Sequence, residues 1–224
     1  MTAEILRAAF LIFKKDLRSE LRTRYVINSL LMFVLVTISI IKFSLGDEKT
    51  GDEILTGLLW IVVFFTSSNG LARTFVKEEE KETSVALKLS TMPAAVIFGK
   101  LFFNLLLTFI LNCFILILFI LITDYRVINI SGFLITFFLG NLGLVSASTI
   151  IAAIISKANS KGTLYPVLTF PVLLPLLMTV INATKLASLG VDTEKLGGEI
   201  QILISYTVVV TISALFLFRF VWED

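Results

Sequence analysis

Six long runs of apolar residues constrain this chain more than any other feature. A helix needs about 20 residues to cross the hydrocarbon core of a bilayer, which is roughly 30 Å thick. The runs lack the alternation of a barrel strand, and in lipid a continuously apolar segment satisfies its own backbone hydrogen bonds only as a helix. The sequence therefore predicts an all-α membrane protein with six transmembrane helices, at residues 26–45, 54–72, 98–123, 131–155, 164–184 and 200–221.

Lysine and arginine are distributed unevenly between the connecting segments, and this bias orients the predicted spans. Basic residues concentrate on the cytoplasmic side of membrane proteins. The other side of this chain has only Lys42, Lys49, Arg126, Lys185 and Lys195. We therefore expect both termini in the cytoplasm. The formal net charge of +2 conceals this asymmetry, which indicates contact with lipid headgroups and no nucleic-acid partner.

The first 25 residues predict an amphipathic helix in the membrane interface rather than a cleavable signal. An elbow helix of this kind either anchors the first span or transmits movement to the bundle. Its apolar residues recur at spacings of three and four, at Leu6, Phe10, Phe13, Leu17 and Leu21, opposite Lys14, Lys15, Arg18 and Arg22.

Several common chemistries have no residues to support them. The chain contains no histidine, its one cysteine, Cys113, falls inside a span, and no phosphate-binding loop motif is present. These absences argue against a serine-protease triad, a histidine-ligated zinc site and nucleotide hydrolysis. We expect no catalytic residue, no metal site and no cofactor bound by this chain.

Polar and small residues within the spans leave two interpretations open. Asn104 and Asn112 need hydrogen-bonding partners in hydrocarbon, so they either join helices or line a pathway. The small residues around Gly143 and Ala147 allow close helix approach, either within the chain or between subunits.

Three prolines, Pro166, Pro171 and Pro175, interrupt the fifth predicted span. Each removes a backbone donor and opposes straight helix geometry. The sequence therefore predicts a broken or kinked helix, which is either structural or located near a cavity or moving part.

A dense charged insert lies between the second and third spans. It contains the acidic run Glu78, Glu79, Glu80 and Glu82, interleaved with lysine. Such a run forms either a solvated connecting helix, stabilised by ion pairs worth about 0.2–0.5 kcal/mol each, or a surface on which another protein docks.

The order of these features resembles the permease subunits of ABC-2-type exporters, and most closely the haem exporter protein B (CcmB) family. The residues that carry the resemblance are Arg73, Phe75 and Glu78 of the insert, Pro93, the Gly99-Lys100-Leu101 stretch, Asn104, and the proline series Pro166, Pro171 and Pro175.

The resemblance implies a fold, partners and a role. Residues 1–224 are expected to form a single permease domain of the ABC-2 type, with the elbow helix at 1–25 and a cytoplasmic coupling segment at 73–97. In this family an ATPase subunit (CcmA-like) docks on that segment, which assigns ATPase coupling to Arg73, Phe75, Glu78, Glu79, Glu80, Glu82, Pro93 and Lys100.

The further partners implied are a CcmC-like membrane protein, a haem chaperone and a second permease or permease-like subunit. The location implied is the bacterial inner membrane, and haem is the cargo of the complex rather than a cofactor of this chain. Two other functions share the predicted topology: an ABC-2 exporter of a lipid, glycan or drug, and a membrane scaffold that needs no ATPase.

Overall fold

The computed structural model describes residues 2–46, 50–80, 83–157 and 161–223. Within these ranges the chain is helical, with no strand. The helices are α1 (Thr2–Thr23), α2 (Tyr25–Leu45), α3 (Asp52–Leu71), α4 (Val76–Glu80), α5 (Ser84–Ser90), α6 (Pro93–Thr123), α7 (Ile130–Ser156), α8 (Lys161–Ser188) and α9 (Gly197–Glu223).

The six predicted spans are confirmed as six long helices, α2, α3, α6, α7, α8 and α9. Each is long and apolar enough to cross a membrane. The observed helices extend past several of the predicted limits, because the helical backbone hydrogen bonding continues beyond each predicted run. Helix α6, for example, begins at Pro93, five residues before its predicted start. Proline suits this first position because its missing N–H would have no partner within the helix.

Helix α7 is the centre of the bundle and packs most extensively against α8 and α9. Its small residues make this possible. A Cβ atom on Gly140 would lie 2.9 Å from Val180 of α8, and one on Gly143 would lie 2.9 Å from Leu176 of the same helix. The small residues of α7 therefore serve packing within the chain, the first of the two alternatives that the sequence left open.

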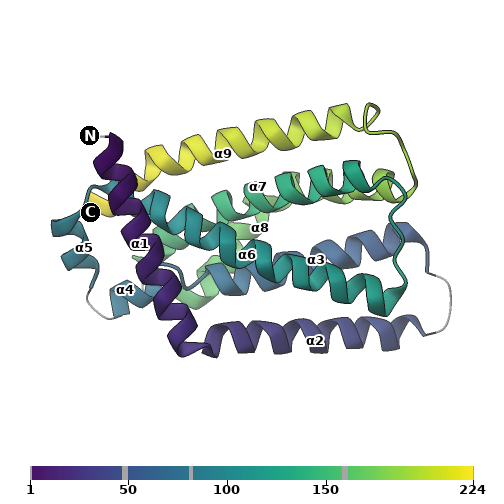
Figure 1. Cartoon of the computed structure of the whole chain (residues 1–224), viewed down its shortest axis with the longest axis horizontal. Coiled ribbons are helices and arrows are strands. Elements are labelled where there is room, and N and C mark those ends of the chain that lie inside the picture. Colours follow the sequence, from purple (N-terminus) through teal and green to yellow (C-terminus); the bar gives the residue numbers. More distant parts are fainter. Residues whose placement is uncertain (1, 47–49, 81–82, 158–160, 224) are drawn as a thin grey trace.

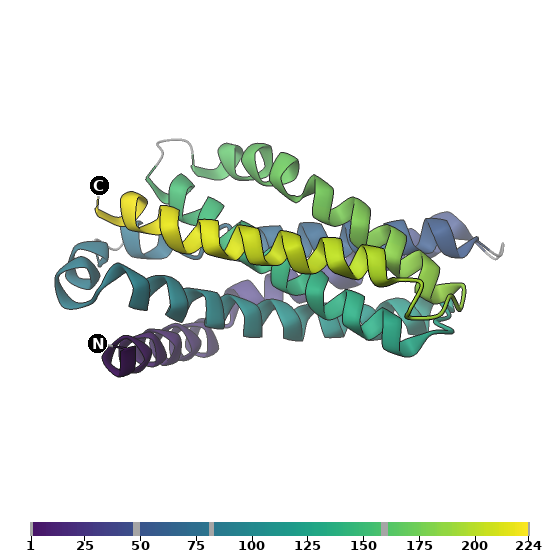
Figure 2. The same cartoon turned by 90° about the horizontal axis from the view of Figure 1, so that it is seen from above.

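One end of the bundle gathers the chain ends and the charged insert (Figure 1). Helices α1, α4 and α5 lie at this end, which we call the charged end. Helix α1 runs across the bundle rather than along it and packs against the start of α6 (Figures 1 and 2). Arg24 alone separates α1 from α2, and its left-handed backbone, with a φ of 48°, turns the chain between them. The predicted elbow helix is thus α1.

Helix α8 is continuous through its three prolines, so the predicted break is absent. Figure 2 shows the helix bending along its length instead. The hydroxyl of Tyr206 in α9 donates a hydrogen bond of 2.8 Å to the carbonyl of Val172, which lies between Pro171 and Pro175. The prolines therefore kink α8 without interrupting it, and this hydrogen bond ties the segment between two of them to α9.

Candidate functional site

The charged insert folds as two short helices that meet the bundle in different ways. Helix α4 carries part of the acidic run and packs against α7. Helix α5 follows Thr83 and ends at Ser90, where the extended backbone of Thr91 and Met92 leads into Pro93. The insert thus returns directly to α6, and this short return keeps α4 close to the first turns of α6.

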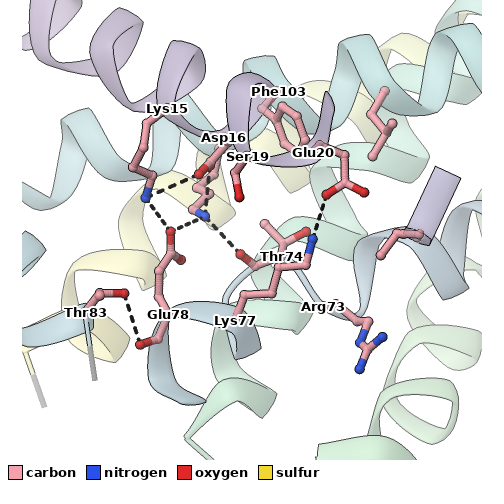
Figure 3. Close-up of a pocket in the computed structure, with 14 residues that line it drawn as sticks. Lys15, Asp16, Ser19, Glu20, Arg73, Thr74, Lys77, Glu78, Thr83 and Phe103 are labelled. Carbon is pink, nitrogen blue, oxygen red and sulfur yellow. Dashed lines mark hydrogen bonds and ion pairs between the residues drawn. The ribbon is translucent and has the colours of Figure 1, made fainter. Parts of the chain in front are cut away.

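Lys100 of α6 lies at the centre of a buried ion-pair network. Figure 3 shows its partners Asp16, Thr74 and Glu78. The side chain of Lys100 is 3% exposed. The Nζ atom lies 2.6 Å from Oε1 of Glu78 and 2.9 Å from Oδ2 of Asp16, and it donates to the carbonyl oxygen of Thr74 at 3.0 Å. The ammonium group also lies 5.4 Å from the ring centroid of Phe75, within cation–π range.

Helix α1 contributes two buried carboxylates to this network. Asp16 and Glu20 are one turn apart, and the buried face of α1 continues through Ile12 and Ala9. Asp16 contacts Lys100, whereas Glu20 pairs with Lys77 of α4 at 2.6 Å. These two acids are not among the residues predicted from the sequence. Asp16 and Glu20 follow Ile12 at intervals of four residues on a largely basic helix. This spacing, which places them on the buried face, is the sequence signal that could have revealed them.

Lys15 completes the network from the more exposed side. Its Nζ atom lies 2.7 Å from Glu78 and 3.3 Å from Asp16. Burial lowers the pKa of Lys15, but the charges of Asp16 and Glu78 outweigh this effect and raise the pKa above its ordinary value. The buried carboxylates thus hold the lysine in its charged form.

Gly99 allows α1 to approach closely enough for these contacts. A Cβ atom at this position would lie 2.7 Å from the carbonyl oxygen of Ala9 and 2.8 Å from Cβ of Ile12. Both atoms belong to the backbone or its first carbon, so neither can move away by changing rotamer. Gly99 therefore brings Asp16 into contact distance of the adjacent Lys100.

A polar cavity of about 190 Å³ borders the network. Its walls include Lys15, Asp16, Glu20, Lys77 and Glu78. The second carboxylate oxygens of Glu20 and Glu78 make no hydrogen bond to a described residue. A polar cavity of this size has room for water, which can solvate such oxygens.

Phe75 connects the insert to the end of α9. Its ring, 1% exposed, lies 5.5 Å from that of Phe218 and 6.2 Å from that of Trp222. On the other side of α4, Glu79 pairs with Lys157 at the end of α7, at 3.2 Å. The insert is therefore joined to α1, α6, α7 and α9 by specific side-chain contacts.

Asn104 and Asn112 extend these connections into the bundle. Asn104 accepts a hydrogen bond from Thr74 at 3.2 Å and donates one to Thr149 of α7 at 2.8 Å. Asn112 similarly bonds Ser67 of α3, and also Asn141 of α7 at 2.5 Å. Both amides join helices, as the first of the two sequence interpretations expected.

Helix α5 has the opposite character, because it exposes apolar side chains. Leu89 is 86% exposed and Val85 is more than half exposed, as is Met92, two residues beyond the end of the helix. Only Ser84 of this helix is fully buried, while Leu87 packs partly against the core. An apolar surface beside the charged network is the feature of this end most suited to contact with another protein.

The structure divides the eight residues predicted to couple an ATPase. Phe75, Glu78 and Lys100 are buried, Glu79 and Pro93 are half-buried, and Arg73 and Glu80 are exposed, whereas Glu82 lies outside the described residues. The interpretation of the acidic run as a solvated helix is wrong for Glu78, because Lys100 and Lys15 neutralise it inside the protein. The docking role of these residues stays a prediction.

In the described part of the chain, no three acidic, cysteine or histidine side chains stand close enough together to hold a metal ion.

Comparison with known proteins gives a direct family assignment. A search of curated proteins finds no match. The family model described as CcmB protein matches residues 7–220, nearly the whole length. The chain therefore belongs to the CcmB family.

Proposed function

We propose that this chain is the permease subunit of an ABC transporter that acts in haem export or delivery for cytochrome c maturation, and that residues 73–97 couple it to a separate ATPase subunit. CcmB membership implies a membrane permease for haem export in cytochrome c maturation. The charged end of the bundle supports the coupling role.

The burial of Lys100 against Glu78 and Asp16 carries the coupling proposal. Separating buried ion pairs leaves uncompensated charge in a low-dielectric interior, at a cost of about 3–5 kcal/mol. A force on α4 is therefore transmitted to α1 and α6 rather than dissipated by breaking the contacts. In this arrangement Phe75, Glu78 and Lys100 join the insert to the bundle, and they do not themselves touch the ATPase.

The exposed face of α5 is the proposed docking surface for a CcmA-like ATPase. Val85, Leu89 and Met92 are apolar and exposed, and apolar anchors surrounded by polar groups are typical of the centre of a protein interface. Glu80 is exposed nearby in the sequence and supplies charge at its edge. The proposed orientation puts this end, with both termini, in the cytoplasm of a bacterial cell.

ATP-driven closure of the ATPase would displace α4 and α5 together, and the network would carry the displacement into the long helices. The kinked α8 is the element best suited to yield, because its prolines weaken the helix at three points. Two permease or permease-like subunits are expected in the complex, one for each ATPase subunit of a closing pair.

Haem is proposed as the cargo of the complex. This chain has no histidine, so the proposal leaves iron ligation to a CcmC-like membrane protein and a haem chaperone. ATP hydrolysis then serves to move haem or to release the loaded chaperone.

A co-purification experiment tests the coupling proposal. The variant V85E/L89E is expected to lose most of the ATPase that purifies with the wild-type chain in mild detergent. L189E is the matched control, because Leu189 is also more than half exposed but lies at the opposite end of the bundle. If V85E/L89E retains the ATPase at the wild-type yield, α5 is not the docking surface.

Loss of the chain should also abolish c-type cytochromes. An exporter of lipid, glycan or drug would leave them at their normal level, and a scaffold would retain them when the ATPase is inactivated.

A further inference from the structure

Arg73 stands apart from the ion-pair network although it lines the same cavity. Figure 3 shows its guanidinium group directed away from Lys77 and Glu78. The side chain is exposed, and it makes no hydrogen bond or ion pair with any residue that the structure describes. The five donors of a guanidinium group in a fixed fork are well matched to phosphate oxygens.

A groove between α2 and α3 begins at Arg73. It encloses about 260 Å³, far more than a single water molecule needs. The walls are formed by Tyr25, Val26, Ser29, Leu30 and Phe33 of α2, by Asn69 of α3, and by Arg73 itself.

The groove changes from polar to apolar along its length. Arg73, Asn69 and Ser29 offer hydrogen-bonding groups, whereas Leu30 and Phe33 offer apolar surface. Tyr25 is the first residue of α2, so the groove starts at the end of a membrane span. Phe33 lies eight residues further, or about 12 Å along the helix axis. This gradient matches that of a phospholipid, from its headgroup to its upper acyl chain.

The charge around the groove favours an anionic lipid. None of the residues lining it is acidic, so the lining offers no carboxylate to the cationic group of a zwitterionic headgroup. The exposed face of α1, lined by Lys14, Arg18 and Arg22, borders the cavity that leads to Arg73. Such a basic surface raises the local concentration of anionic headgroups.

We propose that this groove is a binding site for one anionic glycerophospholipid. Arg73 holds the phosphate, Ser29 and Asn69 bond the glycerol and headgroup oxygens, and the upper acyl chain lies against Leu30 and Phe33. The site is separate from the α5 docking surface and does not depend on the proposed transport function.

Native mass spectrometry of the purified chain in detergent tests the proposal. Phosphatidylglycerol and phosphatidylcholine with identical acyl chains are added in separate titrations. The wild-type chain is expected to retain one phosphatidylglycerol with at least about tenfold higher affinity than phosphatidylcholine, and R73Q should lose this preference because its phosphate contact is charge-assisted. R126Q is the matched control, since Arg126 is an exposed arginine at the opposite end of the bundle.

Three outcomes would overturn the proposal. The first is equal retention of the two lipids by the wild-type chain, and the second is an unchanged preference in R73Q. The third is displacement of the lipid by inorganic phosphate at equal concentration, because this would indicate a site for a free anion. Thermal unfolding of R73Q without added lipid should match that of the wild-type chain, which separates loss of the site from loss of the fold.

Discussion

The Nζ atom of Lys100 lies 2.6 Å from Oε1 of Glu78, with both side chains buried at the charged end of the bundle. This pair joins α6 to α4, and Asp16 joins both to α1. Glu78 belongs to an acidic run that the sequence alone presents as surface charge. In the structure it therefore makes an internal contact. The consequences for stability can be measured residue by residue.

Lys100→Met removes the cation that Asp16 and Glu78 share. Two carboxylates are then left buried with only the half-exposed Lys15 to compensate them, and we expect a loss of about 3–5 kcal/mol in the free energy of unfolding. Denaturant titration in detergent measures this loss. K42M, which removes an exposed lysine at the far end of α2, should change stability by less than about 0.5 kcal/mol. Equal effects of the two variants would contradict the network.

Glu78→Gln and Glu80→Gln form a matched pair on the same short helix. The first removes a buried charge that Lys100 and Lys15 both contact, so it should cost about 1.5–3 kcal/mol. The second alters an exposed residue and should be nearly neutral. Hydrogen exchange of the α4 backbone provides the measurement, with faster exchange expected in E78Q alone. Faster exchange in E80Q to the same degree would mean that both acids are solvated.

The contribution of Lys15 to stability should depend on pH at the alkaline end. Its pKa in the folded chain is raised above the ordinary value of 10.5. A raised lysine pKa gives stability that is fully present below 10.5 and is lost as the pH rises through the folded-state value. The difference in unfolding temperature between wild type and K15M should thus be constant from neutral pH upward and shrink only above pH 10.5. A difference that stays unchanged as the pH rises well beyond 10.5 would refute this assignment.

Gly99→Ala and Gly57→Ala separate helix propensity from packing. Alanine in place of glycine within a helix is intrinsically favourable by about 1 kcal/mol. At Gly57 no atom lies within 4 Å of the added carbon, whereas at Gly99 the carbonyl oxygen of Ala9 lies 2.7 Å away. G57A should therefore be neutral or stabilising, and G99A should destabilise the chain and increase hydrogen exchange in α1. A stabilised G99A would show that α1 does not depend on this close approach.

Phe75→Ala removes the ring between Lys100 and the end of α9. The expected cost is about 3–5 kcal/mol, because a fully buried aromatic side chain leaves a cavity. Trp222 lies against this ring, so its fluorescence emission should shift to longer wavelength as its surroundings become more polar. F43A is the control, since Phe43 is 87% exposed. An unchanged emission spectrum in F75A would place Trp222 outside this contact.

Much of the fold follows from local sequence. A run of about 20 apolar residues forms a helix in lipid whatever its neighbours are, which is why the six spans could be located to within a few residues. The elbow helix was likewise visible in the spacing of Leu6, Phe10 and Phe13. A bend in α8 was expected from its prolines, but the sequence left open whether the helix was broken or only kinked, because it does not reveal which neighbours pack against the bend.

The sequence by itself determined the membrane-spanning architecture, the position of the charged insert and the resemblance to the CcmB family. Only the tertiary structure decided which charges of the insert are internal. Glu78 and Glu80 are chemically equivalent in the sequence, and they differ because folding brings Lys100 from 22 positions away and Lys15 from 63 positions away to one of them. A charge can be buried only where opposite charge meets it, and that meeting depends on the packing of α1 against α6, which no local pattern encodes.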